Sequence, residues 1–125
     1  MSVVYDAGVL VAADRGDRRV WAEHRARLEL GVAPLTTGPV VAQVSRSGQQ
    51  GQVRRFLRGC EIVPFAADEA HEVGALLGAA GMADVVDAHL IVVARASGAT
   101  VLTSDEADLA QLAKHGSRPV RIRRI

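Results

Sequence analysis

The chain has 125 residues, of which 49% are hydrophobic and only 3% aromatic, and its formal net charge is +1. This length is sufficient to bury a core of Val, Leu and Ala without disulfides or a structural metal. The net charge is too small to indicate nucleic-acid binding by itself. Fourteen of the fifteen cationic residues are arginine, a bias that a GC-rich genome explains more readily than phosphate recognition does.

The single Cys60 excludes an intrachain disulfide and suits a reducing cytoplasm. No basic-then-apolar leader is recognisable at the start of the chain, and no uncharged apolar run approaches the roughly 20 residues of a membrane span. We therefore expect a cytoplasmic protein that is neither secreted nor inserted in a membrane.

Short apolar runs alternate with runs of helical periodicity from one end of the chain to the other. Because parallel neighbouring strands need crossover connections, this alternation predicts a single α/β domain, residues 1–125, with a mostly parallel sheet covered on both faces. The expected strands are residues 3–5, 32–36, 61–65, 100–103 and 120–122. The expected helices are residues 9–13, 18–30, 40–46, 67–80 and 85–96, with a short basic helix at Arg54, Arg55 and Arg58 and a last helix carrying Leu109, Leu112 and Ala113 inward.

The predicted helix 18–30 should begin at Asp17, whose side chain can cap its first turn. Val20, Trp21 and Leu28 share one side of this helix and are its expected core-facing residues.

Four aspartates stand where the predicted elements begin or end. Asp6 follows the first strand and Asp105 follows the fourth, and the carboxyl ends of parallel strands form the edge where α/β sheets bind ligands. Asp84 and Asp87 are one helical turn apart at the start of the predicted helix 85–96, which is apolar on nearly every face and is therefore expected to be buried. Carboxylates brought together raise one another's pKa, and a divalent cation that prefers oxygen ligands, Mg²⁺ or Mn²⁺, would remove this cost. Taken singly, each acid has a capping role as its alternative, least so Asp6 because Asp is disfavoured in strands.

The segment VVYDAGVLVA, with Asp6, and the segment DAHLIVVARASGATVLTSD, from Asp87 to Asp105, resemble the acidic motifs of PIN-domain ribonucleases. More narrowly they resemble the VapC-type toxins of prokaryotic toxin–antitoxin pairs, and the resemblance spans essentially the whole chain. It implies a PIN-like α/β/α sandwich in which Asp6, Asp87 and Asp105 hold Mg²⁺ or Mn²⁺. It also implies endoribonuclease activity on RNA, inhibition by a small antitoxin, and a homodimer.

One position departs from the family pattern. The family's P-x-x-x-E places a Glu where this chain, four residues after Pro39, has Gln43. A Gln carbonyl can ligate a hard cation but adds no charge, so metal affinity should fall. We hypothesise that Asp84, on the same helical face as Asp87, supplies the missing charge. The alternative is a PIN-like RNA- or protein-binding module that binds metal too weakly to cut RNA.

Other classes are less well supported. A receiver-like phosphoacceptor domain needs an acid after a middle strand and a late Lys, whereas this chain has Pro64-Phe65 and only Lys114 in a helix. His89 is expected to be structural, and no paired Cys or second nearby His supports a zinc site. There is no G-x-S-x-G elbow and no dinucleotide fingerprint.

Two groups of arginines have open roles. The first group either contacts RNA or protects an edge strand, and consists of Arg118, Arg121, Arg123 and Arg124. For the second group a solvated helix start is favoured over RNA contact, and it consists of Arg15, Arg18 and Arg19.

Overall fold

The structure is a computed structural model that describes residues 2–125. Its centre is a five-stranded sheet in the order β3-β2-β1-β4-β5, with every neighbouring pair parallel. The predicted parallel α/β sheet is confirmed. The strands are β1 (Val3–Tyr5), β2 (Leu35–Thr37), β3 (Glu61–Val63), β4 (Thr100–Thr103) and β5 (Ile122–Arg124). The helices are α1 (Ala7–Asp14), α2 (Arg18–Glu29), α3 (Gly38–Val44), α4 (Gly51–Leu57), the 3₁₀ turn η1 (Ala67–Glu69), α5 (Ala70–Ala80), α6 (Val85–Ser97) and α7 (Ala107–Ala113).

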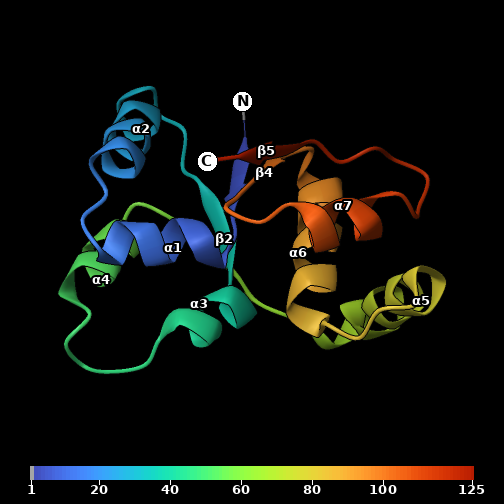
Figure 1. The fold of residues 1–125 in the computed structure, drawn as a ribbon. Coiled ribbons are helices and arrows are strands. Elements are labelled where there is room, and N and C mark those ends of the chain that lie inside the picture. The colour runs from blue at the N-terminus through green and yellow to red at the C-terminus, as the bar shows by residue number, and fades with distance from the viewer. Residues whose placement is uncertain (1) are drawn as a thin grey trace.

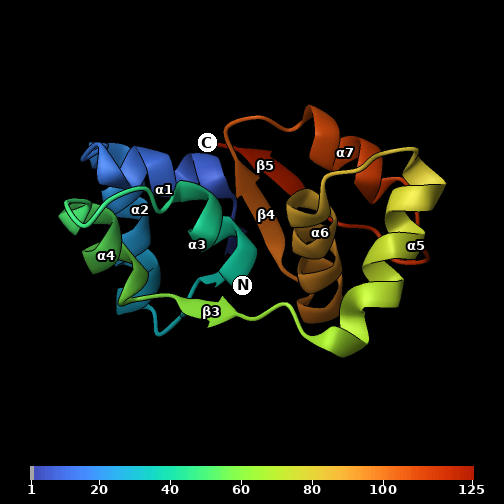
Figure 2. The same cartoon turned by 90° about the horizontal axis from the view of Figure 1, so that it is seen from below.

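The helices form a layer on each side of the sheet (Figures 1 and 2). Helices α1 to α4 lie on one side, because the connections from β1 to β2 and from β2 to β3 cross there. The connection from β3 to β4 returns on the opposite side through α5 and α6, and α7 packs beside them. The chain therefore reverses its direction of travel across the sheet at the boundary between β1 and β4. Such a reversal is the position where α/β sheets leave a crevice at the carboxyl ends of their strands.

Helix α6 is the most deeply buried helix of the described chain. Every residue from Ala88 to Ala94 is buried, as the predicted run of apolar residues on all faces required. The helix packs against β1 and β4 on one side and is covered by α5 and α7 on the other. It ends at Gly98, whose φ of 66° is the left-handed conformation that glycine adopts at helix ends.

Two predicted strands are displaced by two or three residues. The second strand occupies Leu35–Thr37 rather than residues 32–36, and the last occupies Ile122–Arg124 rather than residues 120–122. Their positions follow from the ladders, in which Leu35 pairs with Val4 and Ile122 pairs with Val101. In strands of three residues, this pairing outweighs the local apolar pattern.

Smaller differences concern where elements begin and end. The third strand stops at Val63, two residues before the predicted end at Phe65, because Pro64 has no N–H for the ladder. Helix α3 starts earlier than predicted, at Gly38, because the Thr37 side chain caps it by accepting from the Val40 N–H at 3.2 Å. The predicted helix 67–80 opens with the 3₁₀ turn η1 before α5.

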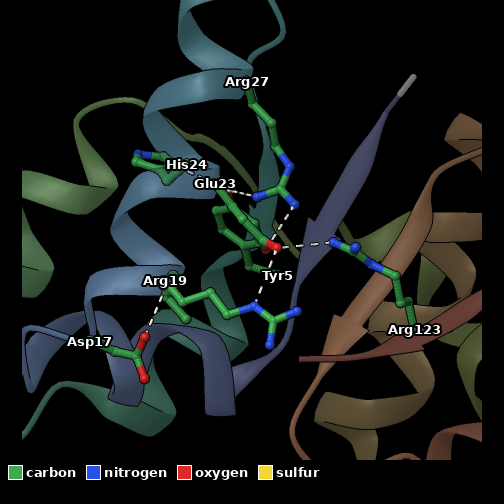
Figure 3. Close-up of polar contacts among 8 residues, drawn as sticks. Tyr5, Asp17, Arg19, Glu23, His24, Arg27 and Arg123 are labelled. Carbon is green, nitrogen blue, oxygen red and sulfur yellow. Dashed lines mark hydrogen bonds and ion pairs between the residues drawn. The ribbon is translucent and has the colours of Figure 1, made fainter.

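A hydrogen-bonded chain fixes α2 on the sheet (Figure 3). The Arg27 guanidinium donates to the Tyr5 hydroxyl at 3.1 Å, and the hydroxyl lies 2.9 Å from His24 Nδ1. His24 Nε2 lies 3.1 Å from the Phe56 carbonyl. Burial raises the pKa of Tyr5 to about 12 and lowers the pKa of His24, so a neutral His24 accepts from Tyr5 and donates to Phe56. His24 therefore takes the core position predicted for Leu28, whose side chain is 40% exposed.

Glu23 joins the same helix to the far edge of the sheet. Its carboxylate lies within 4 Å of Arg19 and Arg27 on α2 and of Arg123 on β5, at 3.8, 3.5 and 3.7 Å (Figure 3). The predicted cap of this helix is also present, since Asp17 Oδ1 accepts from the Val20 N–H at 3.0 Å.

Among residues 2–125, no single helix is long and apolar enough to cross a membrane. Only residues 67–80 and 85–97, taken together as a sharply bent pair, would meet that test.

Candidate metal centre at the sheet edge

The first acid, Asp6, stands where β1 ends and α1 begins. Its N–H continues the sheet ladder by donating to the Leu102 carbonyl at 3.0 Å. Its carboxylate accepts a 2.7 Å hydrogen bond from the hydroxyl of Thr103, the fully buried last residue of β4. The same hydroxyl accepts from the Asp105 N–H at 3.1 Å. Thr103 thereby links the first and last predicted acids of the site, which are ninety-nine residues apart in the chain.

Asp105 lies in the exposed turn between β4 and α7. Its Oδ1 accepts from the Ala107 N–H at 3.3 Å, so part of the predicted capping role is present. This turn packs closely against the first turn of α1. A Cβ added at Gly8 would clash with Ser104 Oγ and would lie 3.2 Å from the Ser104 backbone nitrogen. Gly8 is therefore the residue that allows α1 and this turn to approach each other.

Asp84 and Asp87 lie at the start of α6. Asp84 is the N-cap, and its Oδ1 accepts from the Asp87 N–H at 3.1 Å. The capping alternative for Asp84 is thus present in the structure. The Asp84 side chain is exposed, and its negative charge contributes to raising the pKa of Asp87.

Asp87 carries the clearest electrostatic signature of the site. Burial, followed by the negative charges of Asp84, Asp6, Asp108 and Asp105, raises its pKa from 3.8 to about 7. The positive end of the α6 dipole favours a carboxylate at this position, yet the combined burial and repulsion prevail. The acids are therefore close enough to repel one another. Each acid offers only oxygen atoms as metal ligands, and oxygen ligands suit Mg²⁺ or Mn²⁺.

The acids do not form a ready-made ligand set. Within residues 2–125, no group of three or more His, Cys, Asp or Glu side chains is arranged to hold a metal ion. The residues fit a divalent cation in charge and donor type, and their carboxylates would have to converge on it.

Two other residues that the sequence analysis considered are Gln43 and His89. Gln43 is exposed on α3, which packs against α1 and α6, and in the described chain no hydrogen bond joins it to the acids. His89 is fully buried, stacks on Phe65 at 4.6 Å between ring centroids, and has Nε2 3.5 Å from Glu69. It belongs to the core between α6 and η1.

Sequence reasoning missed Thr103 and Gly8, and it did not place Asp108 among the acids of the site. A polar residue at the end of an otherwise apolar strand, two positions before an acid, was the available signal for Thr103. Nothing in the sequence near Gly8 indicates its contact with Ser104, which is ninety-six residues away.

An arginine-rich border lies beside the acids. Ser104 shares a cavity of about 400 Å³ with Arg19, Arg123 and Arg124 and with two acids, Asp17 and Glu23. Glu23 pairs with Arg19 and Arg123, which leaves Arg124 without an ion pair in the described chain. Arg124 pairs in register with Thr103 in the sheet. Positive charge therefore lies one strand away from the four acids Asp6, Asp84, Asp87 and Asp105, which we call the acidic edge.

Comparison with known proteins identifies the family and the fold. Residues 3–115 match the PIN domain family, and no curated protein sequence matches the chain significantly. Among solved structures, the fold is similar to a chain of VapBC2 from Rickettsia felis bound to a DNA fragment from its promoter, with 18% identity, a TM-score of 0.71, and coverage of 100% of this chain and 99% of that one. It is also similar to a chain of FitAB bound to the IR36 DNA fragment, with 14% identity, a TM-score of 0.66, and coverage of 98% and 94%. A chain of FitAcB from Neisseria gonorrhoeae gives 16% identity, a TM-score of 0.61, and coverage of 96% and 95%. The chain belongs to the PIN-domain family.

Proposed function

We propose that this protein is a Mg²⁺- or Mn²⁺-dependent endoribonuclease that acts as the toxin of a toxin–antitoxin pair. One observation carries the proposal: burial of the Asp87 carboxylate, together with the negative charges of acids at the ends of β1 and β4 and at the start of α6, raises its pKa to about 7. A PIN-domain fold with this concentration of carboxylates is best explained by a cation that serves phosphodiester chemistry.

In this proposal Asp6, Asp87 and Asp105 hold the cation, and Asp84 adds charge beside them. When bound, the cation would supply a water of lowered pKa and positive charge opposite the scissile phosphate. Thr103 keeps the Asp6 carboxylate oriented through its 2.7 Å hydrogen bond. Arg124 and Arg19, at the border of the acidic edge, would hold neighbouring phosphates. A flexible single-stranded or looped RNA is the expected substrate because its backbone can bend toward the acids.

The test is cleavage of a single-stranded RNA by the purified chain in Mn²⁺, compared with the same reaction in EDTA. We expect cleavage that Asp6→Asn reduces by at least about a hundredfold, the scale of losing one component of a catalytic electrostatic site. Asp68→Asn is the matched control, because this carboxylate is exposed on η1 and does not contribute to the Asp87 shift. Equal activity of the two variants would contradict the assignment.

The alternative is an RNA- or protein-binding module without cleavage. Gln43 in place of the family's Glu, and the absence of a converged ligand set in residues 2–125, are the observations that favour it. RNA binding with no Mn²⁺-dependent turnover would establish this alternative.

We also propose the partners. The VapBC2 and FitAB structures are of two-component complexes with DNA, and by likeness we propose a small antitoxin for this chain, and a homodimer. A mainly apolar groove of about 770 Å³ between the end of α2 and the β1-β4-β5 face is a suitable docking site. It includes Leu30, which is 80% exposed, and Ile122, with Arg27 and Arg121 at its border. These features suit an apolar segment with acidic residues.

A further inference from the structure

A second cavity lies away from the acidic edge, where α2 begins beside α4. It has a volume of about 470 Å³ and is lined by Gly16, Arg18, Trp21, Arg25, Gln52 and Arg55. Three of these six residues are arginines and none is acidic. Gly16 follows the last turn of α1, whereas Asp6 precedes its first turn, so the cavity and Asp6 lie at opposite ends of this helix.

The three arginines of this cavity form no ion pair within the described chain. The ion pairs that arginines make there belong to Arg19, Arg27 and Arg123. Asp14 and Asp17 instead accept backbone hydrogen bonds, from Val53 N–H at 3.2 Å and from Val20 N–H at 3.0 Å. Three unpaired guanidinium groups around one cavity repel each other and favour an anionic ligand.

Trp21 gives the cavity an aromatic wall with a fixed orientation. Its indole N–H donates to the Ala13 carbonyl at 2.9 Å, and its ring meets the Phe56 ring edge-on at 5.1 Å and 81°. The ring is half-buried, and the Arg25 guanidinium carbon lies 6.0 Å from its centroid. Arginine groups beside a rigid aromatic face match a phosphate with its attached base, because bases stack on aromatic side chains while guanidinium groups bind phosphate.

The loop that closes the cavity is shaped by Gly16. Its φ is +74°, and a Cβ there would lie 3.2 Å from Gln52 Oε1. The Gln52 amide is thereby brought to the cavity, where it adds neutral donors and acceptors of the kind that contact base edges.

We propose that this cavity is a binding subsite for a phosphate and a base of single-stranded RNA, separate from the acidic edge; the choice of RNA rests on the proposed function. Helix α1 has eight residues, so the subsite lies about 12 Å along it from Asp6 at 1.5 Å per residue. With about 3.4 Å of axial rise per nucleotide in a duplex strand, the two sites are a few nucleotides apart on one RNA. The subsite would hold the strand while another phosphate reaches the acids.

The experiment uses Trp21, which is the only tryptophan in the chain, so its fluorescence reports this cavity alone. A single-stranded uridine dodecamer is titrated in EDTA, which separates binding from cleavage. We expect saturable quenching of Trp21. The double variant Arg25→Ala/Arg55→Ala should bind at least about tenfold more weakly, the scale of a lost charge-assisted hydrogen bond. Its plot of log affinity against log salt should be less steep by about 1.4, because each single-strand phosphate contact contributes about 0.7.

The matched control is Arg58→Ala/Lys114→Ala, which removes the same charge at exposed positions outside the cavity. All four side chains are exposed, and thermal unfolding followed by circular dichroism should give similar midpoints for both double variants. Equal weakening by the two double variants would overturn the proposal, as would RNA that binds without quenching Trp21. A glutamate-rich peptide that quenches Trp21 and displaces the RNA would also overturn it, by assigning the cavity to an acidic protein segment.

Failure of the subsite and failure of the proposed function give different results. If the chain does not cleave RNA in Mn²⁺ but quenching depends on Arg25 and Arg55, the nuclease proposal fails and the subsite stands. If the chain cleaves RNA and Arg25→Ala/Arg55→Ala leaves both KM and fluorescence unchanged, the subsite alone fails.

Discussion

At the scale of single residues, Asp87 determines how the protein responds to pH. Its pKa is about 7 in the folded, metal-free chain and 3.8 in an unfolded one, so the folded state binds the proton more tightly. The resulting stability is fully present below pH 3.8 and is lost as the pH rises through about 7. Burial of the Asp87 carboxylate and repulsion from the other acids thus destabilise the metal-free protein near neutral pH, and a bound cation would reverse this effect.

We predict that Asp87→Asn abolishes most of this pH dependence. In EDTA the wild-type free energy of unfolding should fall between pH 5 and pH 8 by on the order of 1–3 kcal/mol, which is the effect of a shift at 1.36 kcal/mol per pKa unit after discounting for partial solvent screening. The variant should be more stable than the wild type at pH 8. Urea unfolding at the two pH values measures this, with Asp68→Asn as the control that should keep the wild-type slope. The lowered pKa of His24 makes stability rise with pH in both proteins, so the comparison is between wild type and Asp87→Asn: an equal pH dependence of the two would contradict the clustered charges.

Asp84 has two separable roles, because asparagine is as good an N-cap as aspartate. Asp84→Asn should therefore keep the 3.1 Å bond from the Asp87 N–H and remove only the charge, whereas Asp84→Ala removes both. We expect Mn²⁺ affinity, measured by calorimetry, to fall about equally in the two variants. The stability of the metal-free protein should fall by about 1 kcal/mol only in Asp84→Ala. Unchanged Mn²⁺ affinity in Asp84→Asn would reduce Asp84 to a capping residue.

At the scale of elements, the acidic edge depends on how closely α1 approaches the turn after β4. Gly8 lies in the first turn of α1, and a side chain there would meet both the side chain and the backbone of Ser104. Because the backbone is involved, rotation of the Ser104 hydroxymethyl group alone would not relieve the clash. The helix or the turn would have to move, and Asp6 with it.

We predict that Gly8→Ala lowers RNA cleavage by at least about tenfold while the chain remains folded, because a misplacement of about 1 Å at a reacting centre is costly. Gly74→Ala is the matched control, since nothing lies within 4 Å of a Cβ at this exposed position in α5. The control should keep full activity and gain up to about 1 kcal/mol in stability, the helix-propensity difference between the two residues. Equal activity of the two variants would show that the close approach at Gly8 does not position the acids.

At the scale of the whole molecule, substrate and partner would use different surfaces. The acidic edge and the Trp21 cavity lie at the two ends of α1, whereas the apolar groove lies between the end of α2 and β5. The ion pairs of Glu23 with Arg27 and Arg123 connect α2 to β5 along this groove. Arg123 lines both this groove and the cavity beside the acids, so the two surfaces meet at that one arginine.

We predict that Leu30→Glu separates partner binding from catalysis. Leu30 is 80% exposed, so the substitution should leave stability and RNA cleavage unchanged. It should weaken binding of the small protein encoded beside this chain, because a charge replaces an apolar contact in the groove. Co-expression tests this: the neighbouring protein should relieve growth inhibition by the wild type and fail to relieve inhibition by Leu30→Glu. Equal relief of both would place the partner elsewhere.

The amino-acid sequence determined the class of fold because its signals are local. The alternation of apolar runs with helical periodicity specified the order of strands and helices, and the apolar run from Val85 specified a buried α6. The same pattern of strands and helices predicted that Asp6, Asp87 and Asp105 lie at the ends of elements. Strand boundaries were less predictable, because strands of three residues take their limits from the partners with which they pair, as β2 and β5 show.

Only the tertiary structure decided what the acids do to one another. The order β3-β2-β1-β4-β5 makes the first and fourth strands neighbours, and no local pattern encodes which strands are adjacent. That adjacency lets Thr103 join Asp6 to Asp105, brings Gly8 against Ser104, and places four other carboxylates around Asp87. The residues that could hold a cation are readable in the sequence, whereas the repulsion that makes a cation favourable exists only after distant segments have packed together.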